Sequence, residues 1–171
     1  MRNLYLLRHA KSSWKDEELP DFERPLANRG KRACDLLGKF IHSNEIDFDL
    51  VICSTAVRAR DTIALVRQVS RIRAEVRYDE RLYEASAERL LELASQVESD
   101  KKKVLLVGHN PGFEELIQLL TGVTRPFPTA ALARITLKIS KWSESFEGKG
   151  SLEWFVTPRE LENLREEKVV R

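Results

Sequence analysis

Two histidines in this sequence each follow a short apolar run. His9 comes after the run of residues 3–7 and Arg8, and His109 comes after the run of residues 104–108. An imidazole in such a position can act as a nucleophile, a general acid or base, or a metal ligand. If the two runs are neighbouring parallel strands, both imidazoles emerge at the carboxyl edge of one sheet, which is where open α/β sheets bind their ligands.

Two arginines are expected beside these histidines. Arg8 precedes His9 directly, and Arg58 ends the segment 54–58, which follows another apolar run. The planar guanidinium fork matches the oxygens of a phosphoryl group. Each arginine alone could be an ordinary partner of a surface carboxylate. Together with two histidines at strand ends, they favour a phosphate site.

The positive neighbours also bear on what the histidines do. A catalytic zinc site needs three protein ligands, and guanidinium groups beside a metal cation are unfavourable. The same cations would lower the pKa of an imidazole and leave a nitrogen lone pair free, which suits a nucleophile. A satisfied structural imidazole is the alternative for each ring. We predict no metal and no cofactor, and we ascribe His42 to the carbonyl end of a helix.

The rest of the pattern alternates between strands and helices. Helices are predicted for the apolar face of residues 33–41, from about 57 to 69 with Ser54 or Thr55 as N-cap, from about 87 to 97, and for residues 113–120 with Gly122 as C-cap. Further strands are predicted at 48–53, at 75–78 as an edge, and at 133–139 and 151–156 as a closing antiparallel hairpin. This order predicts a three-layer α/β/α sandwich with a mostly parallel central sheet.

Composition narrows the class of protein. The 171 residues fit one domain, residues 1–171, whose charged tail from about residue 158 is helix-prone and expected to fray. Twenty-nine basic and 27 acidic residues interleave, which does not indicate a nucleic-acid surface. No apolar stretch approaches the roughly 20 residues of a membrane span, and the amino terminus does not read as a signal peptide. We expect a cytoplasmic protein with buried, reduced Cys34 and Cys53 and with Trp142 and Trp154 in the core, and the oligomeric state is left open.

Several motifs, in order, resemble those of one family. The motifs are Leu6-Leu7-Arg8-His9-Ala10-Lys11-Ser12, Arg24-Pro25-Leu26 with Arg29-Gly30, the segment Ser54 to Thr62, and Val107-Gly108-His109-Asn110-Pro111-Gly112. They resemble the histidine phosphatase superfamily, which includes cofactor-dependent phosphoglycerate mutases and histidine acid phosphatases. Within it, the chain is most similar to the compact SixA-type phosphohistidine phosphatases over roughly residues 3 to 137. The resemblance implies a phosphoglycerate mutase-like fold.

The resemblance also implies roles for residues. His9 would attack phosphorus and carry the phosphoryl group, while Arg8, Arg58 and His109 would stabilise the charge on its oxygens. Such a reaction needs no metal, because fixed cations already surround the anion. Arg24 would add a contact if its loop folds back over the site. Lys11 is a further candidate for substrate binding.

Glu84 is the candidate general acid. It lies where many members of the superfamily place a carboxylate, and an alkoxide leaving group would need its proton. The P–N bond of phosphohistidine breaks readily once the departing imidazole is protonated, so a SixA-type enzyme can do without a dedicated acid. A solvated residue near a helix N-terminus is the equal alternative for Glu84.

Loop lengths suggest what reaches the site. Only residues 12–22 and 78–86 could cover it, and an open site suits a large substrate such as a histidine-containing phosphotransfer domain. The first hypothesis is therefore a metal-independent phosphatase of protein phosphohistidine that works through a covalent intermediate. Two alternatives stay open: a phosphatase or mutase for small phosphorylated metabolites, and a module that binds phosphorylated partners without turning them over.

Overall fold

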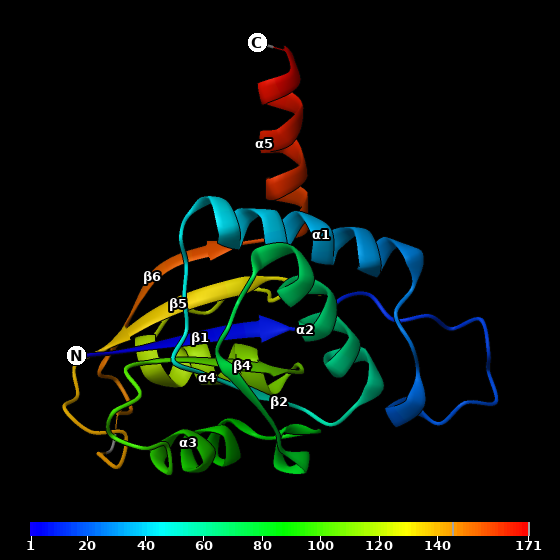
Figure 1. Cartoon of the computed structure of the whole chain (residues 1–171). Helices are drawn as coiled ribbons and strands as arrows, with labels where there is room; N and C mark the ends of the chain where they lie inside the picture. Colours follow the sequence, from blue (N-terminus) through cyan, green and yellow to red (C-terminus); the bar gives the residue numbers. More distant parts are fainter. Residues whose placement is uncertain (145, 171) are drawn as a thin grey trace.

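The apolar runs and helical periods of the sequence form alternating strands and helices (Figure 1). The computed structural model describes residues 1–144 and 146–170. The strands are β1 (Arg2–Arg8), β2 (Leu50–Cys53), β3 (Glu75–Tyr78), β4 (Lys103–Gly108), β5 (Leu132–Leu137) and β6 (Gly150–Val156). The α-helices are α1 (Asn28–Ser43), α2 (Val57–Ser70), α3 (Ala87–Ser95), α4 (Gly112–Thr121) and α5 (Pro158–Val170), and the short 3-10 turns are η1 (Asp21–Glu23) and η2 (Glu80–Leu82).

The strands form one sheet in the order β3-β2-β4-β1-β5-β6. The first four of these run parallel, while β5 is antiparallel to β1 and to β6. The predicted fold class, the edge position of β3 and the antiparallel closing hairpin are therefore confirmed. The two strands that precede the histidines are parallel neighbours, with Arg8 opposite Gly108. Their carboxyl ends meet at one edge, as the sequence predicted.

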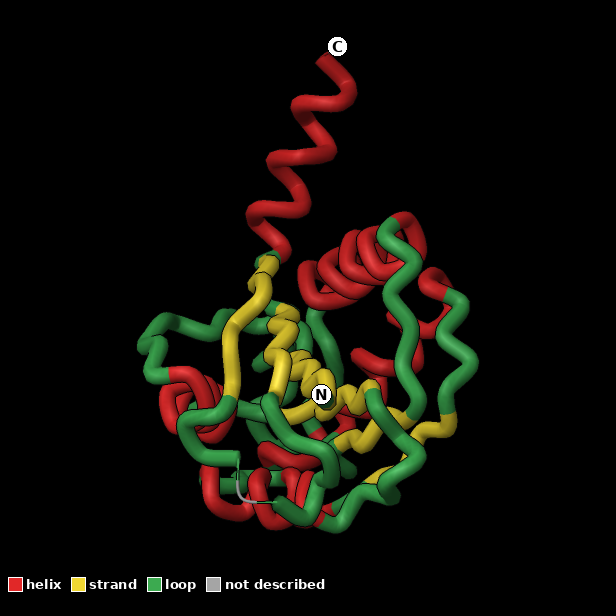
Figure 2. The backbone as a smooth tube through the Cα atoms, turned by 90° about the vertical axis from the view of Figure 1, so that its left-hand side faces the viewer, coloured by secondary structure: helices red, strands yellow, loops and turns green. Residues whose placement is uncertain are grey.

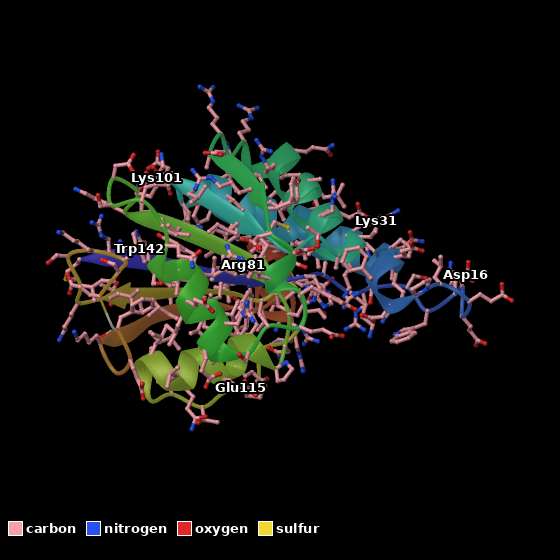
Figure 3. All side chains as sticks on the ribbon, turned by 90° about the horizontal axis from the view of Figure 1, so that it is seen from below. Asp16, Lys31, Arg81, Lys101, Glu115 and Trp142 are labelled. Carbon is pink, nitrogen blue, oxygen red and sulfur yellow. The ribbon has the colours of Figure 1, made fainter. Side chains whose placement is uncertain are left out.

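The sheet separates two apolar cores. Because side chains alternate along a strand, Leu4 and Leu6 of β1 face one core while Tyr5 and Leu7 face the other. Helices α3 and α4 cover the first face, and α1 and α2 cover the second (Figure 1). The long loop after β1 extends beyond the carboxyl edge, and Asp16 marks its tip at the end of the molecule opposite Trp142 (Figure 3).

Three local predictions need correction. Helix α3 ends at Ser95 rather than near residue 97, and β5 ends at Leu137 rather than at 139. The N-cap of α2 is Ala56, without a side-chain cap, so the prediction of Ser54 or Thr55 was wrong. The physical reason lies in Ser54, whose hydroxyl bonds to His109 and to the amide of Ala56 instead of to the first turn of the helix. Gly122 is the C-cap of α4, as predicted.

The C-terminal part closes the sheet and then leaves it. Trp142 is buried in the connection between β5 and β6, and Trp154 on β6 packs edge-on against Tyr5 and Phe40. The charged tail forms α5, which packs beside α1 at its start and then projects from the body of the protein (Figure 2). Fraying of this tail stays a prediction. In the described part of the chain, no helix combines the length and the apolar character that crossing a membrane would require.

Candidate active site

The two histidines lie side by side at the carboxyl edge of the sheet. The amide of His9 donates to the carbonyl of Gly108 at 3.0 Å, which continues the β1–β4 ladder by one residue. The ring centroids of His9 and His109 are 5.2 Å apart. Both residues are buried: 7% of the surface of His9 and 8% of the surface of His109 is exposed to solvent. The pairing inferred from the two apolar runs therefore exists in the fold.

The hydrogen bonds of His9 determine which ring nitrogen is free. Its Nδ1 lies 2.8 Å from the carbonyl oxygen of Ala10, which can only accept, so the ring proton is on Nδ1. Nε2 then carries a lone pair, and Nε of Arg58 donates to it at 3.3 Å. The hydroxyl of Thr62 holds this arrangement, since it accepts from the amide of Ala10 and donates to the carbonyl of Arg58. His9 thus has an oriented lone pair on Nε2, and Arg58 must release its hydrogen bond to this atom before the lone pair can attack.

Close backbone packing fixes the segment that follows His9. A Cβ on Gly30 would lie 2.3 Å from the backbone oxygen of Lys11, so only glycine lets the first turn of α1 approach this closely. The Lys11 side chain itself is exposed, and no hydrogen bond or ion pair joins it to the site within the described residues. Its role in substrate binding stays a prediction.

Arg8 reaches the site from the end of β1. One guanidinium nitrogen, Nη1, donates to the carbonyl of Phe127 at 2.9 Å, which anchors the side chain. Its Nε is buried and has no hydrogen-bond partner among the residues that the structure describes. Such donors are rarely left unsatisfied in a protein interior. An oxyanion placed here would supply the acceptor.

Burial keeps both imidazoles neutral. It lowers the pKa of His9 to about 4, with Arg58, Arg8 and Arg24 adding to the decrease. It lowers the pKa of His109 to about 3, and His9 and Arg58 contribute in the same direction. Neutral rings were expected from the sequence, with neighbouring cations as the cause. Loss of hydration is the larger cause.

Asp21 is a site residue that the sequence motifs did not predict. Its carboxylate accepts from Arg58 Nη2 at 3.0 Å, from Arg24 Nη1 at 2.9 Å and from the Tyr83 hydroxyl at 2.7 Å. These bonds, Tyr83 first, lower the pKa of Asp21, while burial and the carboxylate raise the pKa of Tyr83 to about 12. The spacing of three residues between Asp21 and Arg24 was the available signal. The Asp21 carboxylate therefore pairs with Arg24 and Arg58, two residues that were predicted to bind phosphate.

Arg24 does fold back toward the site, as its loop was expected to do. All three of its guanidinium nitrogens already have partners: Nε donates to the carbonyl of Ser13, Nη1 to Asp21 and Nη2 to the hydroxyl of Ser12. Its guanidinium also lies 3.2 Å from the ring centroid of Trp14. Arg24 must give up one of these bonds before it can contact a substrate.

Aromatic side chains join the two segments that were expected to cover the site. Phe22 packs edge-on against Tyr83 at 5.1 Å between centroids, and Tyr83 packs on His109 at 5.4 Å. The loop after β1 and the segment after β3 therefore meet over the imidazoles. A cavity of about 600 Å³ opens beside them, lined by Phe22, Thr55, Glu80, Arg81, Tyr83, Glu84, Ala85, Ser86 and Arg89. This cavity gives a leaving group room next to the site.

Glu84 lies on the wall of that cavity and is exposed. Its backbone φ of 54° is in the left-handed region, which directs the chain sharply between η2 and α3. No hydrogen bond joins its carboxylate to His9 or His109 in the described part of the chain. Its role as an acid stays a prediction, as does the solvated alternative.

The arrangement suits chemistry on a phosphoryl group. His9 supplies an oriented lone pair, and the guanidinium of Arg58 lies next to it. Nε of Arg8 and Nδ1 of His109 are buried and have no hydrogen-bond partner in the described residues. No group of three or more His, Cys, Asp or Glu side chains within residues 1–144 and 146–170 is arranged to hold a metal ion. Attack on phosphorus, with positive charge and hydrogen-bond donors around its oxygens, is what this geometry favours.

Comparisons with known proteins agree with the site. Residues 4–106 match the histidine phosphatase superfamily, branch 1. An uncharacterised protein of Mycobacterium tuberculosis is 34% identical over 164 residues, covering 90% of this chain and all of the relative. A structure from Nakamurella multipartitia, provisionally named phosphohistidine phosphatase SixA, has a TM-score of 0.80 and 27% identity and covers 92% of this chain and 96% of its own.

A second solved structure, the protein histidine phosphatase SixA complexed with tungstate, shares the fold. Its TM-score is 0.76 at 23% identity, with 93% of this chain and 99% of that one covered. The match to the family spans more than half of the chain and includes His9, Arg8 and Arg58. The chain therefore belongs to branch 1 of the histidine phosphatase superfamily, whose phosphatase chemistry matches the site, and it is similar in fold to these SixA structures.

Proposed function

We propose that this protein removes phosphoryl groups from phosphohistidine on a protein through a covalent intermediate on His9. The observation that carries the proposal is the Nε2 lone pair of His9, which is buried, neutral and oriented by the bond from Nδ1 to the carbonyl of Ala10. A module that only binds phosphate would need the cations but not this lone pair. Catalysis is therefore favoured over binding alone.

The first step forms a bond between Nε2 of His9 and phosphorus. As this bond forms, the bond from phosphorus to the leaving nitrogen breaks, and that nitrogen keeps the electron pair. The departing imidazole leaves as a neutral ring when its other nitrogen is protonated. Arg8, Arg58 and His109 surround the three equatorial oxygens, where negative charge has to be stabilised.

The second step releases phosphate. Water attacks phosphorus, the bond to Nε2 of His9 breaks, and the ring recovers its lone pair while a water proton passes to solvent. Two displacements replace one difficult hydrolysis. None of these steps draws on a group other than the residues named here and water.

Phosphohistidine fits the site because its leaving group does not need a general acid from the protein. Glu84, the candidate acid, lines the cavity, and in the described residues no hydrogen bond joins it to either histidine, so a substrate that needs no added acid suits the arrangement better. The relatives named as phosphohistidine and protein histidine phosphatases support the same substrate class. A histidine-containing phosphotransfer domain is the kind of partner we propose.

A second candidate function is hydrolysis of small phosphate esters. It is favoured by the position of Glu84 on the wall of the cavity beside the site, from which its carboxyl group could reach an ester oxygen. Glu84→Gln separates the two. Loss of turnover on esters but not on phosphohistidine would assign Glu84 as the acid for poor leaving groups, whereas unchanged turnover on both would leave it a solvated residue.

The test of the main proposal is a comparison of substrates. Phosphate release is measured with a phosphohistidine protein, a phosphohistidine peptide and an aryl phosphate, each with and without a chelator. We expect the phosphohistidine substrates to have the higher kcat/KM, and chelation to leave it unchanged. A preference for the aryl ester would favour the second candidate. Binding of all three without release would favour a non-catalytic module.

The covalent intermediate has its own test. Brief reaction with labelled substrate followed by quenching in base, which preserves phosphohistidine, should leave label on His9. In His9→Ala, both the label and turnover should disappear while circular dichroism and tungstate binding persist. Turnover by a correctly folded His9→Ala variant would refute the covalent mechanism.

A further inference from the structure

Ser54 is a polar side chain that none of the proposed steps uses. It follows β2 directly and is fully buried, with none of its surface exposed. Its Oγ lies 2.7 Å from Nε2 of His109 and accepts a hydrogen bond from the amide of Ala56 at 3.2 Å. The hydroxyl therefore touches one of the two imidazoles from the side that faces away from Nδ1.

The two bonds of Ser54 determine where its proton points. A backbone amide can only donate, so the contact with Ala56 uses a lone pair of Oγ. The hydroxyl proton then needs an acceptor. Nε2 of His109 is the acceptor in contact with Oγ, and in the described residues no other acceptor bonds to this hydroxyl. A buried hydroxyl is expected to donate when an acceptor is in reach, so Nε2 of His109 carries a lone pair rather than a proton.

This assignment fixes the other ring nitrogen. A neutral imidazole has one proton, so in His109 that proton is on Nδ1. Nδ1 is buried, and no partner for it lies among residues 1–144 and 146–170. The ring centroid of His109 lies 5.2 Å from that of His9, the proposed nucleophile, so the ring lies beside the proposed phosphate site. The unpartnered N–H is thus a donor held ready for an oxyanion.

We propose that Ser54 is a positioning residue that holds His109 in the Nδ1–H tautomer, so that Nδ1 donates to an oxygen of the phosphoryl group. This proposal rests on the proposed function, because it gives His109 its task there. His9 and His109 then share one tautomer but use opposite atoms. The carbonyl of Ala10 frees the Nε2 lone pair of His9 for attack, while the hydroxyl of Ser54 frees the Nδ1 proton of His109 for binding.

The direct test reads the tautomer. Histidine nitrogen shifts are measured by NMR in 15N-labelled protein, with tungstate as the probe of the phosphate site. In the unmodified protein we expect a protonated Nδ1 and an unprotonated Nε2 on His109, and a shift of Nδ1 when tungstate binds. In Ser54→Ala, His109 should no longer show a single Nδ1–H form. A proton on Nε2 in the unmodified protein would overturn the proposal.

Kinetics distinguish positioning from a merely structural role. We expect Ser54→Ala to lower kcat about tenfold, as for loss of one oriented hydrogen bond in the transition state, with a smaller change in KM. Ser70→Ala is the matched control, because it removes another buried serine hydroxyl, at the end of α2, that bonds to a backbone amide away from the site. Its kcat should match that of the unmodified protein.

The outcomes separate this proposal from the proposed function. If the unmodified protein turns over no phosphohistidine, the proposed function fails, but the tautomer and its response to tungstate still test Ser54. If Ser54→Ala folds with the unmodified melting temperature and keeps its kcat, the positioning role is refuted. If Ser54→Ala unfolds, the NMR measurement on the unmodified protein decides alone.

Discussion

The floor and the rim of the site differ in how their polar groups are used. We call the strand-end residues Arg8, His9 and His109 the floor, and the loop residues Asp21 and Arg24 the rim. On the floor, Arg8 Nε and His109 Nδ1 are buried and have no partner among the described residues. On the rim, every guanidinium nitrogen of Arg24 has a partner, and Asp21 accepts three side-chain hydrogen bonds.

This contrast teaches which groups are prepared for a ligand. A donor left unpaired in the interior gains a full hydrogen bond when an anion arrives, whereas a donor that is already paired must first lose one. The floor should therefore supply most of the transition-state stabilisation. The rim should modulate access and affinity.

The sharpest test exchanges one arginine in each region. We expect Arg8→Lys to lower kcat/KM by roughly a hundred- to a thousandfold, the usual cost of one preorganised donor to a developing anion. Arg24→Lys should lower it less than about tenfold, because its fork already binds protein groups. Steady-state kinetics on the substrate with the higher turnover measure both. Equal losses in the two variants would remove the distinction between floor and rim.

Low pH should destabilise the folded protein through the two buried histidines of the floor. In the unfolded chain both imidazoles protonate near the ordinary pKa of 6.5, but in the folded protein the pKa is about 4 for His9 and about 3 for His109. Between the unfolded and the folded pKa the unfolded chain binds more protons, so the free energy of unfolding falls as pH decreases from about 6.5 to about 3, by roughly several kcal/mol. Urea unfolding at several pH values measures this.

A matched pair of variants assigns the acid effect. His109→Gln should show a smaller decrease in the free energy of unfolding over this pH range, because one of the two groups is gone. His42→Gln replaces an exposed histidine at the end of α1 and serves as the control. If both variants lose stability in parallel with the unmodified protein, the buried imidazoles are not the cause.

On the rim, Asp21 should compete with the substrate's own negative charge. Asp21→Asn keeps hydrogen-bonding atoms in place but removes the charge that faces Arg24 and Arg58. We expect inhibition by tungstate to become about three- to tenfold tighter, because the carboxylate is half exposed and its ion pairs are partly screened. Asp35→Asn, in the surface pair with Lys39, controls for net charge. Weaker inhibition in Asp21→Asn would mean that the carboxylate instead holds the arginines in place.

The smallest effect is expected from Tyr83→Phe. The ring contacts with Phe22 and His109 remain, and only the hydroxyl that donates to Asp21 is lost. We expect kcat/KM to change less than about threefold, since the bond is partly exposed and Asp21 keeps both arginines. A loss as large as that of Arg8→Lys would place Tyr83 in the chemistry rather than on the rim.

The floor could be predicted from sequence because strand patterns determine it. Apolar runs indicate where β1 and β4 end, and parallel pairing then brings His9 and His109 together without further information. The rim could not be predicted in the same way. Asp21 meets Tyr83 across 62 residues of sequence, and such contacts between loops have no periodic signal. The prediction of the N-cap of α2 was wrong for a related reason. From the sequence pattern, a serine that caps a helix cannot be distinguished from one such as Ser54, whose hydroxyl bonds to the distant ring of His109.

The bond from the His9 amide to the carbonyl of Gly108 has a consequence for how the protein can be inactivated. It belongs to the pair β1–β4, which lies in the middle of the strand order and is flanked on both sides. Amides of such central strands exchange with solvent hydrogen only when the whole domain opens. Loosening of the loops should therefore expose the site while the backbone bond between His9 and Gly108 stays in place. In hydrogen exchange, the amide of His9 should count among the last amides of the protein to exchange.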